Sequence, residues 1–397
     1  MRRNNGNGGG SEQTTPHMLL LLYSTRGKMK AASKALLDEN FKAGFSIMRE
    51  LPTGKLVSKE PFGFIDGISQ PRIDWSQVQS TDNHDHDHYS NWTALGEIVL
   101  GYLNEYGLYT PRPLIDPAHD PAAENLPDAE DLPALKDFAR NGSYLVMRQL
   151  RQDVEGFWRH IDELAGSNAS LREQLAARMV GRKRDGTPLA PRSPHRIPGI
   201  NSDDAINNFS YDLDRDGVRC PIGAHVRRSN PRTGDYPPDV NGFWSRMLRL
   251  LGFCQQRDDE DLVASTRFHR LMRRGRGYGP ILSPTQALKP DAEQAERGLQ
   301  FICLAGNISR QFEFVQNAWN MRSKFAGLEN ERDPVIGVRE PLSDGTSTNH
   351  FRSVEASGVT REYRQLPEFV NVLGGGYFFM PGIAALRYLA SAKTPED

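Results

Sequence analysis

A chain of 397 residues is long enough for one large domain or two smaller ones. Hydrophobic residues make up 38% and charged residues 25%, and 36 Gly and 26 Pro residues indicate a globular protein with many loops. The formal net charge of -1 gives no general attraction to a polyanion, so the composition does not favour a nucleic-acid partner. The three cysteines, Cys220, Cys254 and Cys303, form no CxxC pair, which argues against a disulfide framework.

The N-terminal stretch is polar. Residues 1–16 are rich in Arg, Asn and Gly, a composition typical of a disordered leader. The apolar run at residues 18–23 is far shorter than a membrane span, and no signal-peptide pattern accompanies it. The sequence therefore predicts a protein without a membrane segment. Its default location is the cytoplasm, although the sequence leaves secretion open.

The first part of the chain changes its apolar pattern twice. Residues 18–23 form a continuous apolar run suited to a buried strand, and apolar residues recur at helical spacing between residues 29 and 37. Residues 45–51 alternate again, so the opening element is predicted as β-α-β. Two segments without an apolar period follow, a polar loop at residues 79–90 and a predicted linker at residues 111–134.

The second part of the chain begins with a predicted strand at residues 143–147 and a helix near residues 152–165. Loops rich in Pro and Arg occupy much of residues 181–240. The remaining expected elements are strands at 299–304 and 369–380, the latter bent at three glycines, and helices at 312–319 and 383–389. Because several connections are too short for parallel crossovers, an α+β fold with antiparallel sheets is predicted.

Three clusters of residues could carry chemistry. The first, at residues 63–71, reads GFIDGISQP and places Asp66 between two glycines. Glycines such as Gly67 permit a tight backbone path and the close approach of a flat ligand. Alone, such a motif more often forms a simple Asx-turn, and it gains weight only from the clusters that accompany it.

The second cluster, at residues 220–232, reads CPIGAHVRRSNPR and sets His225 beside several arginines, including Arg227. A neutral imidazole is a common axial ligand of haem iron, and guanidinium groups can pair with haem propionates. Taken alone, His225 could equally be a hydrogen-bonded structural histidine, and the arginines a solvated face.

The third cluster, at residues 269–279, reads HRLMRRGRGYG and contains Arg273 and Tyr278. A basic loop of this density could bind phosphate, but it lacks a GxxxxGK[ST] cradle. Its glycines and single tyrosine suit a loop that folds over the edge of a cofactor.

Together and in this order, the three clusters resemble those of the dye-decolourising peroxidases, particularly the longer members of that family. The GxxDG aspartate of the family falls on Asp66, its proximal histidine on His225, and its distal arginine on Arg273. Counting back from the strand at residues 377–381, the acidic partner of the proximal histidine falls on Glu368. The resemblance covers roughly residues 18 to 391.

The resemblance implies an α+β fold of two ferredoxin-like domains with antiparallel sheets. We expect a partial N-terminal domain at residues 17–134 and a C-terminal, haem-binding domain at residues 135–397. Family members begin with a further β-α-β segment, so the first domain is expected to be incomplete here. Pairing of ferredoxin-like sheets across subunits would give a homo-oligomer, which the sequence leaves open.

The resemblance also implies a reaction. One haem b per chain would be ligated by His225, and Arg227 and Gly67 would lie against it. Asp66 would move a proton between the two oxygens of hydrogen peroxide, and Arg273 would supply fixed positive charge. Dyes, phenols or similar donors would return single electrons, with Tyr278 as an oxidation site at the surface.

Three other functions compete with this one. A non-catalytic haem-binding or carrier protein on the same fold needs only His225, so the retention of Asp66 and Arg273 argues against it. A metal site on His84, His86 and His88 would lie on a flexible polar loop without fixed geometry. Binding of nucleic acid by the arginines at residues 270–276 lacks interleaved aromatic residues beyond Tyr278.

Overall fold

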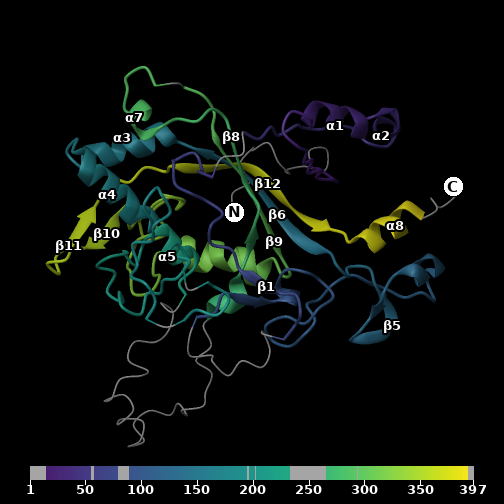
Figure 1. Ribbon diagram of the computed structural model, residues 1–397. Coiled ribbons are helices and arrows are strands. Elements are labelled where there is room, and N and C mark those ends of the chain that lie inside the picture. Colours follow the sequence, from purple (N-terminus) through teal and green to yellow (C-terminus); the bar gives the residue numbers. More distant parts are fainter. Residues whose placement is uncertain are drawn as a thin grey trace, which may run out of the picture.

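The computed structural model describes residues 15–54, 58–78, 89–194, 196–201, 203–232, 265–292 and 294–391. It has an α+β architecture in which helices and loops surround one long twisted sheet (Figure 1). Four of the predicted features lie outside the described residues: most of the leader, most of the polar loop at 79–90 with its three histidines, the predicted loop segment after residue 232, and Cys254.

The central sheet has five antiparallel strands. Its order is β12-β6-β9-β7, and β8 also pairs with β9. The register of β12 shifts between Val372 and Gly374, which confirms the predicted bend at the glycines. The bounds are β6 (Ser143–Gln152), β7 (Met272–Arg273), β8 (Arg276–Tyr278), β9 (Gly298–Ala305) and β12 (Val370–Met380).

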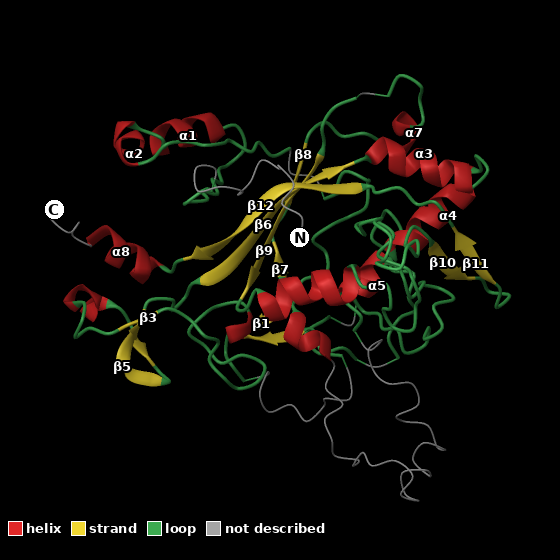
Figure 2. Ribbon diagram, turned by 180° about the vertical axis from the view of Figure 1, so that it is seen from behind, coloured by secondary structure: helices red, strands yellow, loops and turns green. Residues whose placement is uncertain are grey.

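A hydrophobic core holds two helices beside one end of this sheet (Figure 2). In α3 (Val154–Leu164), three apolar residues at helical spacing, Phe157, Trp158 and Ile161, are fully buried. α4 (Ala169–Val180) packs beside it and ends at Gly181, whose φ of 96° is the left-handed conformation of a helix C-terminus. Phe62 and Phe64 insert into the same core, which anchors the segment leading to Asp66.

The remaining elements are short. Three smaller sheets are formed by β1 (Arg72–Asp74) with β2 (Trp92–Ala94), by β3 (Leu114–Ile115), β5 (Leu132–Asp137) and β4 (Asp128–Ala129), and by β10 (Phe351–Val354) with β11 (Thr360–Tyr363). The other helices are α1 (Met29–Leu36), α2 (Glu39–Gly44), α5 (His225–Ser229), α7 (Pro284–Ala287) and α8 (Ile383–Ser391). Short helical turns cover Leu95–Glu97, Pro121–Asn125, Ser265–His269, Ser309–Glu313 and Val315–Asn320. Within the described ranges, every helix is too short or too polar to cross a bilayer.

The predicted elements of the second half are confirmed, whereas the opening β-α-β is wrong in its strands. The helix is present as α1, but residues 18–23 and 45–51 form no strand, and most of their large apolar side chains are exposed. An apolar run becomes a buried strand only where a neighbouring strand pairs with it, and the described residues supply none there. The predicted linker at 111–134 is also wrong, because it contributes β3, β4 and the start of β5.

Candidate functional site

The loop that presents Asp66 is closed by Glu60. The carboxylate of Glu60 accepts hydrogen bonds from the backbone N–H groups of Phe62 and Phe64, both at 2.9 Å. It also accepts one from Nε2 of Gln152 at the end of β6 (2.8 Å), which ties the loop to the central sheet. Burial raises the pKa of Glu60 to about 7, against the lowering effect of these donors. Asp66 therefore projects from a loop that is fixed at its base.

Arg273 meets Asp66 from the edge strand β7. Its Nη1 lies 3.0 Å from Asp66 Oδ1, and its Nη2 donates to the backbone oxygen of Ser69 (3.2 Å). The two side chains of the ion pair are 35% and 36% exposed, so the pair is open to solvent and to small molecules. The structure thus brings together two residues that are 207 positions apart in the sequence, as the sequence analysis expected.

His225 begins the short helix α5 and is held from behind by Asp333. Its Nδ1 lies 2.8 Å from Oδ2 of Asp333, a side chain with no exposed surface. The other oxygen of Asp333 accepts hydrogen bonds from the backbone N–H groups of Val335 and Ile336, at 2.8 and 2.9 Å. No hydrogen bond within the described residues engages Nε2 of His225. Asp333 therefore fixes the orientation of the imidazole through Nδ1, and Nε2 is left free to bind a ligand.

The prediction that Glu368 accepts a hydrogen bond from His225 is wrong. Glu368 instead accepts hydrogen bonds from Asn371 Nδ2 (2.6 Å) and from the backbone N–H of Arg339. Arg339 in turn donates to the backbone oxygen of Asp333 at 2.9 Å. Glu368 thus acts through Arg339 on the turn that carries Asp333, the residue that bonds to His225.

Sequence analysis missed Asp333 because its only local signal is weak. An aspartate before Pro334 is a common turn former, and nothing in its spacing from His225 marks it as a partner. The pairing depends on the long-range packing of residues 331–339 against α5.

The charges around His225 act on its protonation. Burial opposes the imidazolium, but the negative charge of Asp333 and its hydrogen bond outweigh burial and raise the pKa of His225. Arg273 lowers that pKa and Asp66 raises it. The charges of the Asp66–Arg273 pair thus act on the protonation of His225 in opposite directions.

Arg227, expected to pair with a cofactor, is committed elsewhere. Its buried guanidinium donates to the backbone oxygens of Cys220 (2.7 Å), Asp214 (2.9 Å) and Arg215 (3.1 Å). These bonds close the loop before α5, so Arg227 stabilises the position of His225 and does not face an open site. The prediction that Arg227 lies against a cofactor is wrong, because its guanidinium is buried and donates to these three backbone oxygens.

Two further predicted residues have contrasting outcomes. Tyr278 is 8% exposed at the end of β8, so its prediction as a surface site is wrong: pairing of β8 with β9 turns it into the protein. Gly67 has a φ of 77°, and a Cβ built there meets no atom within 4 Å. The space beside Gly67 is thus unobstructed, and its role as a contact of a flat ligand stays a prediction.

The donor set fits a haem better than a bare metal ion. Within the described residues, no group of three or more His, Cys, Asp or Glu side chains could hold a metal ion. Haem iron already has the porphyrin nitrogens as ligands, so the protein needs to supply only one more. An imidazole with a free nitrogen, oriented by a buried carboxylate, is suited to that role. His225 with Asp333 would hold the iron, and Gly67 leaves room for the ring.

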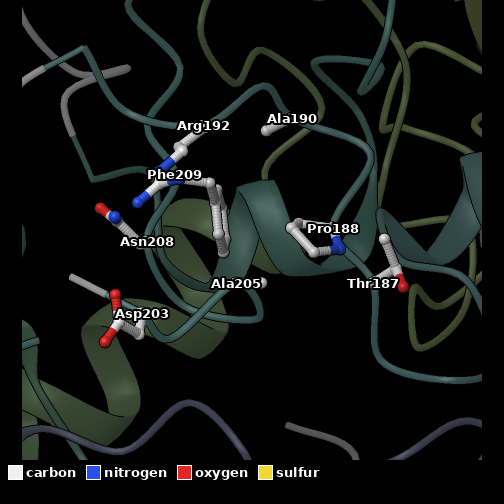
Figure 3. A pocket seen from close by; sticks show the side chains of 8 residues that line it. All are labelled: Thr187, Pro188, Ala190, Arg192, Asp203, Ala205, Asn208 and Phe209. Carbon is white, nitrogen blue, oxygen red and sulfur yellow. The ribbon is translucent and has the colours of Figure 1, made fainter. Parts of the chain in front are cut away.

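A cavity of about 440 Å³ is lined by residues between Thr187 and Phe209 (Figure 3). Asn207, next to the lining residue Asn208, donates to the backbone oxygen of Ile68 at 2.8 Å. Figure 3 shows Asn208 and Asp203 on one side of the Phe209 ring and Pro188 on the other. The lining includes neither Asp66, Arg273 nor His225, so the cavity adjoins the site and is not part of it.

Comparison with known proteins gives consistent relatives, although no protein-family model matches the chain. The chain is 32% identical over 347 residues to the multifunctional dye peroxidase DyP2 of Amycolatopsis, covering 83% of this chain and 61% of the relative. It is 27% identical over 362 residues to a dye-decolorizing peroxidase of Auricularia auricula-judae, covering 88% and 59%. The chain therefore spans about three fifths of the length of these relatives.

The solved structures agree with these relatives. The structure of DyP2 from Amycolatopsis aligns with a TM-score of 0.54 at 29% identity, covering 83% of this chain and 60% of that one. A DyP-type peroxidase of Anabaena aligns with a TM-score of 0.52 at 26% identity, covering 83% and 57%. In sequence and in fold, the chain is thus similar to dye-decolourising peroxidases over more than four fifths of its length.

Proposed function

We propose that this chain is a haem-dependent peroxidase that reduces hydrogen peroxide and oxidises dyes, phenols or similar one-electron donors. The observation that carries the proposal is the assembly of two oriented pairs, Asp66 with Arg273 and His225 with Asp333, from four distant segments. The names of the two relatives reported above, both dye peroxidases, support it. A carrier would need the second pair alone.

The reaction consumes one hydrogen peroxide, two electrons and two protons and yields two water molecules. The haem, when bound, supplies an iron that binds peroxide and passes on the electrons of the donors. The ionised carboxylate of Asp66 takes the proton from one peroxide oxygen and returns it to the other, which then departs as water. A single carboxylate can serve both steps because it projects from a fixed loop into open space.

The other residues of the site hold charge and orientation. The guanidinium of Arg273, fixed 3.0 Å from Asp66, stabilises the ionised carboxylate and the negative charge that develops on the departing oxygen. Asp333 accepts the hydrogen bond of His225 Nδ1, which keeps Nε2 of the imidazole available as a ligand. Arg227 and Arg339 contribute by fixing the two loops that carry this pair.

Asp66→Asn tests the proposal. The amide keeps the shape of the side chain but cannot accept the proton, so the rate at which peroxide changes the absorption spectrum of the haem-loaded protein should fall about 10²- to 10⁴-fold. Asp344→Asn removes a charge from an exposed turn and should leave that rate unchanged. Stopped-flow absorbance with increasing peroxide measures both. A rate in Asp66→Asn equal to that of the wild type would contradict the role of Asp66, and a wild type insensitive to peroxide would favour the carrier.

A further inference from the structure

The position of Arg273 depends on an edge strand that is only two residues long. β7 pairs with β9 on one side, with Arg273 opposite Cys303, and Arg274 donates from its backbone N–H to Ile302 (2.7 Å). On its other side, the peptide groups of Arg273 face no strand. Unpaired edge groups require another partner if the strand is to stay in place.

The side chain of Gln70 provides that partner. Its Oε1 accepts a hydrogen bond from the backbone N–H of Arg273 (3.0 Å), and its Nε2 donates to the backbone oxygen of the same residue (3.3 Å). A carboxamide offers one acceptor and one donor, as the peptide group of a neighbouring strand does. Gln70 thus occupies the place of the next strand along the edge of β7.

Gln70 is fixed in turn by the smaller sheet that follows it. Its backbone oxygen accepts a hydrogen bond from Asn91 Nδ2 (3.0 Å), and the backbone oxygen of Asn91 accepts one from Arg72 in β1 (2.8 Å). The clamp therefore joins β7 to the segment that begins with Asp66 and ends in β1. Arg273 and Asp66 lie on the two sides of this junction.

The ion pair between Arg273 and Asp66 is too weak to fix the relative position of these two side chains. An ion pair exposed by about one third contributes about 0–1 kcal/mol. A displacement of about 1 Å in a reacting group can lower a rate about 100-fold, so the register has to be fixed by something stronger. Arg273 Nη2 also donates to the backbone oxygen of Ser69 (3.2 Å), but this bond holds only the flexible end of the side chain. The two hydrogen bonds of Gln70 are the ones that join the backbone of β7 to the Asp66 segment.

We propose that Gln70 is a positioning residue for Arg273. Its two hydrogen bonds clamp the backbone of β7 to the Asp66 segment and so fix the position of the Arg273 guanidinium relative to the Asp66 carboxylate. The consequence for the reaction rests on the proposed peroxidase function, whereas the clamp itself does not. Glutamine is the residue that this geometry requires: glutamate lacks the donor, asparagine is one methylene shorter, and methionine of similar length has neither group.

Gln70→Met tests the clamp in the haem-free chain. Loss of the Oε1 acceptor should raise the hydrogen-exchange rate of the Arg273 backbone amide at least tenfold, measured by NMR at matched pH. Gln174→Met, at an exposed position of α4 with a single long hydrogen bond to Ser170, is the control and should leave that amide unchanged. Gln70→Asn gives the same result if Gln70→Met fails to fold. An unchanged Arg273 amide in either folded variant overturns the clamp.

A double-mutant cycle in the haem-loaded protein tests whether Gln70 acts through Arg273. We expect Gln70→Met to lower the rate with peroxide about tenfold or more, and to lower it no further in an Arg273→Ala background. Additive losses would overturn the positioning role, because Gln70 would then act independently. If the wild type binds haem but does not respond to peroxide, the proposed function fails, and the amide exchange still decides whether the clamp exists.

Discussion

Replacement of Asp333 by asparagine should weaken the binding of haem. The amide keeps the shape of the side chain and an oxygen for the backbone N–H groups of Val335 and Ile336. It loses the negative charge that lies 2.8 Å from His225 Nδ1. The imidazole then becomes a weaker ligand, because a neutral amide at position 333 accepts the Nδ1–H hydrogen bond less strongly and so raises the basicity of the imidazole less.

The expected loss of haem affinity follows from the burial of the Asp333–His225 pair. Asp333 has no exposed surface, so solvent does not screen its interaction with His225. Loss of an outer-shell partner costs about 10–100-fold in metal affinity, which equals about 1.4–2.8 kcal/mol at 1.4 kcal/mol per tenfold. A charge-assisted hydrogen bond contributes about 1.5–3 kcal/mol, in agreement with that range.

The assay is the dissociation constant for haem, measured from Soret absorbance in competition with an apoprotein of known haem affinity. Glu368→Gln is the matched control, because Glu368 bonds to Asn371 and Arg339 and does not contact His225. Its dissociation constant should stay within about twofold of the wild type. Wild-type affinity in Asp333→Asn, or weakened binding in Glu368→Gln alone, would refute the assignment of Asp333.

Three other predictions concern stability and substrate oxidation. Gly223→Ala should lower the free energy of unfolding by about 1–3 kcal/mol in urea, because the new Cβ would lie 1.9 Å from Glu331 Oε1, whereas Gly44→Ala meets no atom within 4 Å. Burial raises the pKa of Glu60 from 4.5 to about 7, so its contribution to stability is present below pH 4.5 and is lost as the pH rises through 7. The wild type should therefore lose stability relative to Glu60→Gln between pH 5 and pH 8 in chemical denaturation, and a constant difference would refute the shift. Tyr278→Phe should leave the steady-state turnover of a bulky dye unchanged, since Tyr278 is buried; a large loss would restore it as an oxidation site.

The sequence was sufficient for the long, regular elements of the second half. Strand β9 and helix α3 carry apolar patterns that local burial explains, and both lie where the periodicity predicted. Residues 18–23 have an equally clear pattern, yet they form no strand, because pairing depends on a neighbour that the pattern does not encode. The short strands β3 and β4 were missed since two residues are too few for a period.

In the candidate site, too, the residues in local motifs were predicted from the sequence, and those that act through long-range contacts were not. Asp66, Arg273 and His225 were found because each lies in a motif with an unusual local composition, and the structure brings Asp66 and Arg273 into contact. The supporting residues Asp333 and Gln70 act through contacts with segments 108 and 203 positions away. Asp333 lies in a sequence typical of ordinary turns, and Gln70, although inside the first cluster, carries no local signal of the distant strand that it bonds to.

The measurement that tests the central claim most directly is a haem titration of the wild type and His225→Ala, followed by absorbance. We expect the wild type to saturate at one haem per chain with a single sharp end point. His225→Ala should bind far more weakly, and added imidazole should restore its spectrum because it replaces the lost ligand. A His225→Ala protein that takes up haem with wild-type affinity and an identical spectrum would contradict the assignment of His225 and, with it, the site built around it.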